Sequence, residues 1–142
     1  MFFAKLHPLL VHFPIGLLIS GALLEFFGRV QKEEAVRIAG WFNIRLGFWC
    51  VFPVMAVGLF GLGGLEIKEK VKPFLSSHIQ FAFATALVFA LALIVYRFRN
   101  SLWADILYII LLAVGLVCAL GAGYYGGEMA HRFGVAGSGT PY

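Results

Sequence analysis

The side chains with the most chemistry in this chain are its four histidines, His7, His12, His78 and His131. They flank long apolar segments. If these segments run up and down across a membrane, all four histidines fall on one side, named side A here. Imidazole is the commonest protein ligand of metals and changes charge near neutral pH. Ionisable groups inside a membrane are costly and usually functional. The histidines therefore predict a haem or metal site near one membrane face.

The composition is that of an integral membrane protein. Of the 142 residues, 61% are hydrophobic and only 13% are charged, whereas globular domains average about 45–50% apolar and about 25% charged residues. The mean hydropathy is +0.91. The net charge of +4 suits contact with anionic lipid headgroups. No basic run is long enough to indicate nucleic-acid binding. From the length and the hydrophobic composition we expect one domain over residues 1–142, embedded in a lipid bilayer.

Four segments are long enough to cross a bilayer, which takes roughly 20 apolar residues. They cover about residues 8–28, 36–64, 73–96 and 102–125. The connections between them are short, which forces neighbouring helices to run antiparallel. The predicted fold is therefore an all-α, four-helix up-and-down transmembrane bundle with both termini on side A. The tail over 134–142 is rich in Gly, Ser, Thr and Pro and is predicted to be irregular.

The predicted location is the cell's inner (plasma) membrane, as a multi-pass protein. The first apolar run is too long for a signal peptide and is expected to remain as a membrane helix. By the positive-inside rule, the side with more Lys and Arg residues faces the cytoplasm. Five of these residues lie on side A and five on the opposite side, side B. Arg45, inside the second segment and nearer side B, tips the count toward side B in the cytoplasm. We therefore expect both termini outside the cytoplasm.

His12 and His78 are the strongest candidates for a cofactor site. Each follows a proline that is expected to begin a helix, Pro8 or Pro73. At a rise of about 1.5 Å per residue, both imidazoles lie roughly 6–8 Å into their helices. Cofactors are commonly held between facing helices in a bundle core, and two such imidazoles hold b-type haem axially. We expect haem b with His12 and His78 as axial ligands; the alternative is that each bonds to a backbone carbonyl.

The other two histidines have weaker placements. His7 is expected just before the first helix, and it differs from His12 by about 140° around a helix, so the two do not share a face. His7 and His131 are expected to form a second ligand pair or to support the first by hydrogen bonds. Lys72 and Arg132 are side-A cations that are expected to anchor the haem propionates.

A second polar set lies nearer side B. Glu25, Arg45 and Asp105 each fall within an apolar segment and form the predicted intramembrane polar cluster. An unpaired Arg45 would be costly there, so we expect it to pair with Glu25 or Asp105. The functional alternative is a quinone headgroup site or a proton route.

Two stretches near the chain ends carry a family resemblance. Residues 6–15 read LHPLLVHFPI, and residues 126–135 read GGEMAHRFGV. Together with His78 opening the third segment, they resemble a bacterial family of small membrane proteins, domain of unknown function 2231. Members are often fused to or found beside cytochrome and iron–sulfur modules, so the resemblance implies redox work. It implies no established activity.

These observations lead to one expected function and two alternatives. We expect a small, cytochrome b-like membrane protein that takes part in electron transfer, with redox partner proteins or as a homo-oligomer, and not an enzyme that turns over a substrate by itself. The haem would supply the chemistry and the protein its orientation and potential. One alternative is a non-enzymatic structural subunit of a membrane complex. The other is a copper or zinc protein in which three or four of the imidazoles converge.

Overall fold

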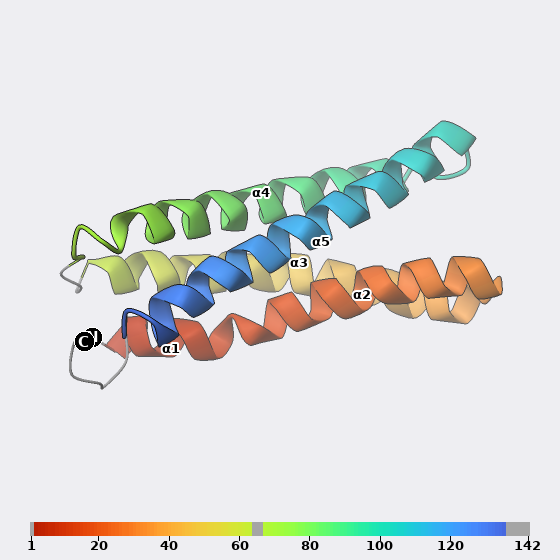
Figure 1. Cartoon of the computed structure of the whole chain (residues 1–142). Helices are drawn as coiled ribbons and strands as arrows, with labels where there is room; N and C mark the ends of the chain where they lie inside the picture. Colours follow the sequence, from red (N-terminus) through yellow and green to blue (C-terminus); the bar gives the residue numbers. More distant parts are fainter. Residues whose placement is uncertain (1, 64–66, 136–142) are drawn as a thin grey trace.

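The computed structural model describes residues 2–63 and 67–135, and over these residues the regular structure is entirely helical. The helices are α1 (Phe2–Leu10), α2 (His12–Gln31), α3 (Glu34–Leu62), α4 (Lys72–Tyr96) and α5 (Leu102–His131). Together α1 and α2 make one membrane-length span, and α3, α4 and α5 are each long and apolar enough to cross a membrane. The predicted four-helix transmembrane bundle is confirmed (Figure 1).

The four spans form two helical hairpins. The first span packs on α3, and α4 packs on α5, while the hairpins touch each other through α2 with α5 and through α3 with α4. In Figure 1, α4 and α2 accordingly lie at opposite edges of the bundle. The first span and α4 are therefore diagonal to each other, so a contact between α1 and α4 passes through the bundle centre.

The first span begins six residues earlier than predicted, at Phe2 instead of Pro8. Its opening turns pack on α3: a Cβ added at Gly61 would lie 3.0 Å from the Cα atom of Ala4. The helix is interrupted at Val11, between α1 and α2. The cause is Pro14, which lacks an N–H and crowds the carbonyl of Leu10. The start of this span therefore depends on a tertiary contact as well as on its own apolar run.

The other boundaries differ less from the prediction. The last span extends to His131 instead of ending near residue 125. The predicted end of the second span, residue 64, and the part of the predicted irregular tail after residue 135 lie outside the described residues. In the bundle centre, Leu18, Ile44, Phe89 and Leu112 are almost completely buried.

Close helix packing depends on glycines. A Cβ added at Gly21 of α2 would lie 2.8 Å from the carbonyl oxygen of Gly40 on α3. Small residues let the backbones of membrane helices approach closely, which replaces the hydrophobic driving force that lipid does not provide. This packing brings the side chains of each hairpin into a defined register.

Candidate functional site

His7 and His78 meet at the centre of the bundle near side A. His7 is on α1 and His78 on α4, the diagonal pair of spans. Their ring centroids are 6.1 Å apart, and the ring planes meet at 84°. Both residues are half-buried. Cofactor and metal sites of helical bundles are built in this way, from side chains of facing helices.

Both rings are held by the same kind of hydrogen bond. Nδ1 of His7 donates to the carbonyl of Val54 at 3.0 Å, and Nδ1 of His78 donates to the carbonyl of Ala122 at 2.9 Å. Because a carbonyl oxygen can only accept, each ring carries its proton on Nδ1. In the neutral form of each ring, the Nε2 lone pair is then available. Metal-bound histidines almost always donate their other ring N–H to a carbonyl or carboxylate in this manner.

Each ring also rests on a glycine of the helix to which it bonds. A Cβ at Gly58 would lie 2.8 Å from Cε1 of His7, and a Cβ at Gly126 would lie 3.1 Å from Cε1 of His78. Each glycine stands four residues, about one helical turn, after the carbonyl that accepts the hydrogen bond. The missing side chains therefore set how closely the rings approach α3 and α5.

The two hairpins repeat this arrangement. In each, the histidine is followed eleven residues later, about three turns, by a fully buried residue that packs on a glycine of the returning helix. These contacts are Leu18 on Gly47 and Phe89 on Gly115. Each of these glycines lies eleven residues before the glycine that seats a ring, Gly58 or Gly126. His7 and His78 are therefore equivalent positions of an internal repeat, and membrane proteins often bind ligands at the interface of such repeats.

The structure brings His7, and not His12, to His78. Because the span begins at Phe2, His7 lies about 8 Å and His78 about 9 Å along their helices, while His12 lies about 15 Å along. The 140° offset between His7 and His12 puts His7 inside the bundle and leaves His12 exposed on its outer surface. His131 is the last residue of α5 and is also exposed. The prediction counted depth from Pro8 and so matched His12 with His78. Counted from the actual start at Phe2, His7 lies at the depth of His78.

A polar cluster lies at the opposite end of the bundle. Glu25 is fully buried, and its Oε1 accepts a hydrogen bond from the Tyr108 hydroxyl at 3.1 Å. Arg29 bridges two acids, with Nη1 3.0 Å from Asp105 Oδ1 and Nη2 3.6 Å from Glu25 Oε2. Nε of Arg37 lies 3.8 Å from the same Glu25 oxygen. Two guanidiniums therefore flank one buried carboxylate.

Arg45, predicted as the cation of this cluster, lies outside it. Its guanidinium carbon is 4.3 Å from the ring centroid of Trp41, and the residue is exposed. Its neighbour Ile44 is fully buried, and one residue turns a helix by about 100°, which directs Arg45 outward. In the part of the chain that the structure describes, Arg29 takes the place that was predicted for Arg45.

The sequence matches the family described as "Predicted membrane protein (DUF2231)" over residues 4–139. The chain belongs to this family. No curated protein and no solved structure matches it. The two stretches that suggested the family lie in the first span and at the end of α5, so in this family member they contribute His7 and Gly126 to the same site.

The cations that were expected to anchor propionates lie at the side-A end of this family member. Lys72 opens α4 and pairs with Glu69. Arg132 follows α5, and its Nη1 lies 3.2 Å from Glu128 Oε2. Both cations are exposed and each is paired with a carboxylate close to it in sequence. Haem propionates that used these cations would have to compete with the local ion pairs.

Convergence of three or four imidazoles, the arrangement expected for a copper or zinc site, is not found. Over residues 2–63 and 67–135, no group of three or more His, Cys, Asp or Glu side chains is placed to hold a metal ion. His12 and His131 are turned to the outside, and two imidazoles remain. The chain itself thus offers a two-histidine centre.

Sequence reasoning missed the residues that hold the two rings. Val54 and Ala122 contribute backbone carbonyls, which leave no trace in residue type. The glycines did carry a signal: the same eleven-residue glycine spacing occurs in the second and fourth spans. A search for internal repeats would have paired the two halves of this family member, and with them the two histidines.

Proposed function

We propose that this protein is a small membrane electron carrier that holds b-type haem between His7 and His78. The observation that carries the proposal is the meeting of two imidazoles from diagonal helices, each with Nδ1 bonded to a carbonyl, which leaves Nε2 for a metal. Haem iron would supply one-electron chemistry, and the chain would set its orientation and potential. It would act with redox partner proteins in the plasma membrane.

The spacing of the two rings suits one metal atom with an imidazole on each side. Metal–nitrogen bonds of about 2 Å place the two Nε2 atoms about 4 Å apart, and roughly 1 Å of ring radius at each end brings the centroids to about 6 Å. The observed separation is 6.1 Å. A porphyrin also extends sideways from its iron, so haem entry requires α1 and α4 to part. Each of these helices packs on its own hairpin partner, which lets the hairpins separate without unfolding.

A copper or zinc ion is the second candidate, favoured by the contact between the rings. A single ion fits the present separation without any movement of the hairpins. Imidazole suits both metals. The remaining ligands would come from a partner chain or from a small molecule. The third candidate, a structural subunit, is supported by the same two hydrogen bonds, since bonds between a side chain and a neighbouring helix also hold membrane bundles together.

The test is a reduced-minus-oxidised optical spectrum of the detergent-purified protein, with a pyridine haemochrome assay for stoichiometry. We expect b-type bands that are lost in both His7→Ala and His78→Ala and kept in His12→Ala. His12 is the matched control because it is exposed on the same span. A preparation that stays colourless after expression with added haem rejects the haem proposal. Copper and zinc analysis of the same preparation then separates an ion site from a structural subunit.

A further inference from the structure

We propose that the polar hollow at side B binds a phosphoethanolamine headgroup, the polar part of phosphatidylethanolamine. The hollow has a volume of about 410 Å³, within the size range of small-molecule sites. Its lining consists of charged and polar residues: Arg29, Glu34, Arg37, Arg99, Asn100 and Asp105. The histidine centre is at the other end of the bundle, so this site is independent of it.

Two of the arginines that line this hollow, Arg29 and Arg37, carry buried nitrogens without hydrogen-bond partners. Within the described residues, Glu25 Oε2, Arg29 Nε, Arg29 Nη2 and Arg37 Nε have no hydrogen-bond partner. Glu25 Oε2 lies 3.6 Å and 3.8 Å from the two guanidiniums, too far for hydrogen bonds. Buried polar groups are nearly always partnered in native proteins. Arg29 and Arg37 are thus short of acceptors, and a bound group that brings acceptors into the hollow could satisfy them once the guanidiniums turn toward it.

The balance of charges selects the kind of headgroup. Three arginines and two carboxylates line the hollow: Arg29, Arg37 and Arg99, with Glu34 and Asp105. The buried carboxylate of Glu25 lies behind Arg29 and Arg37. A purely anionic ligand would meet the lining carboxylates as well as the guanidiniums. A quinone ring would meet charged walls, whereas sites for such rings are mostly apolar. A zwitterion matches both signs, because its phosphate accepts from guanidiniums and its ammonium donates to carboxylates.

The hollow also lies at the depth of lipid headgroups. Arg29 is two residues from the end of α2, and Arg37 is in the first turn of α3. At the turn that contributes Arg99 and Asn100 to the lining, Phe98 is 65% exposed, and Trp103, two residues before Asp105, is 81% exposed. Exposed aromatic residues of this kind mark the membrane–water interface. A lipid of the adjacent leaflet can therefore reach the hollow while its acyl chains stay in the bilayer.

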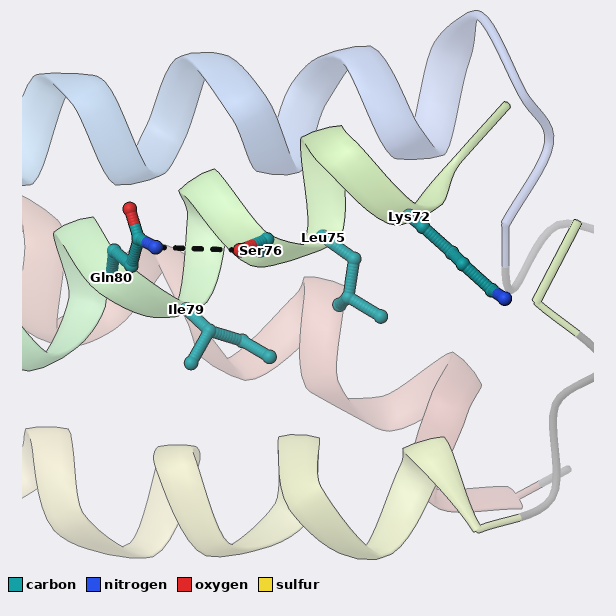
Figure 2. A pocket seen from close by; sticks show the side chains of 5 residues that line it. All are labelled: Lys72, Leu75, Ser76, Ile79 and Gln80. Atoms are coloured by element: carbon teal, nitrogen blue, oxygen red, sulfur yellow. Dashed lines mark hydrogen bonds between the residues drawn. The ribbon is translucent and has the colours of Figure 1, made fainter. Parts of the chain in front are cut away.

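The pocket of Figure 2, on the outer face of α4, differs in character. Leu75 and Ile79 point into it, with Lys72 at one end and the hydrogen-bonded pair Ser76 and Gln80 beside it. Acyl chains at this height of the bundle would cover such a surface without a specific headgroup contact.

The test is native mass spectrometry of the full chain, reconstituted in an equal mixture of phosphatidylethanolamine, phosphatidylglycerol and phosphatidylcholine with the same acyl chains. We expect phosphatidylethanolamine to be retained preferentially. Arg99→Gln and Arg37→Gln should each lower its retention by roughly tenfold, the effect of losing one charge-assisted hydrogen bond. Arg97→Gln is the matched control, since it removes one charge from the same turn but Arg97 is exposed and does not line the hollow.

Three results would overturn the proposal. Preferential retention of phosphatidylglycerol would show an anionic site, and equal retention of the three lipids would show no headgroup site. Equal loss in Arg97→Gln and Arg99→Gln would show a general charge effect. The lipid comparison in the wild-type chain needs no variant, so it decides the matter even if a variant folds poorly. A colourless protein that still retains phosphatidylethanolamine would reject the haem proposal and leave this one standing.

Discussion

The imidazoles of His7 and His78 are nearly perpendicular, at 84°, with their centroids 6.1 Å apart. Nδ1 of each ring bonds to the second helix of its own hairpin: His7 to the Val54 carbonyl on α3, and His78 to the Ala122 carbonyl on α5. The contact between the rings is therefore a contact between the two hairpins, and it leaves each Nε2 free of these bonds.

Gly58→Ala should displace the ring of His7. The new Cβ would lie 2.8 Å from Cε1 of the ring, so the ring must move, and overpacking of this kind typically costs about 1–3 kcal/mol. Unfolding in a detergent titration measures the stability loss, and the optical or metal-binding assay measures the centre. Gly123→Ala is the control because its Cβ would meet open space. Equal behaviour of the two variants would contradict the proposed seat.

Tyr108→Phe should destabilise the bundle by about 1–3 kcal/mol. The substitution removes the hydroxyl that donates to Oε1 of the buried Glu25, and an unsatisfied buried acceptor carries a cost of this size. Thermal unfolding in micelles, followed by circular dichroism, measures it. Tyr124→Phe, at an exposed position, should leave the midpoint unchanged. If Tyr108→Phe also leaves the unfolding midpoint unchanged, another donor must replace the hydroxyl.

Arg29→Gln should be far more destabilising than Arg45→Gln. Arg29 bridges Glu25 and Asp105. Its loss leaves Asp105 unpaired and leaves buried Glu25 with only the more distant Arg37, at a cost of roughly 3 kcal/mol, the low end of the usual range for breaking a buried pair. Arg45 loses only its position over Trp41, worth under about 1 kcal/mol at an exposed site. Unfolding midpoints of the two variants, measured side by side, test this order. A larger loss for Arg45→Gln than for Arg29→Gln would contradict the assignment of Arg29 as the cation of the cluster.

Phe89→Ala should open a cavity beside Gly115. Phe89 is completely buried, and its ring packs on that glycine. The loss should approach the roughly 3–5 kcal/mol known for such truncations in soluble cores, since packing, more than transfer from water, stabilises membrane helices. The control is Leu87→Ala, because Leu87 is 61% exposed. Similar unfolding midpoints for both variants would argue against Phe89 as a core residue of the second hairpin.

Much of the architecture follows from the sequence because a bilayer imposes strict conditions. A span needs roughly 20 apolar residues, and each spanning backbone must satisfy its own hydrogen bonds. Four such runs with short connections allow little besides an up-and-down bundle. The same rule places His7 and His78 toward one end, and Glu25 and Asp105 toward the other.

The pairing of side chains was decided by tertiary structure. The spans are apolar almost all round, so no amphipathic stripe marks which face turns inward. His12 and Arg45 were placed by depth along the chain, and depth says nothing about rotation around the helix axis. The contact of Ala4 with Gly61 moves the helix start to Phe2 and so brings His7 to the level of His78. Close approach at glycines then sets the rotation of each helix, which turns His7 inward and Arg45 outward. Arg29 and Glu25 are four residues apart on α2, so their proximity was readable from the sequence, but the burial of Glu25 beside Tyr108 was not.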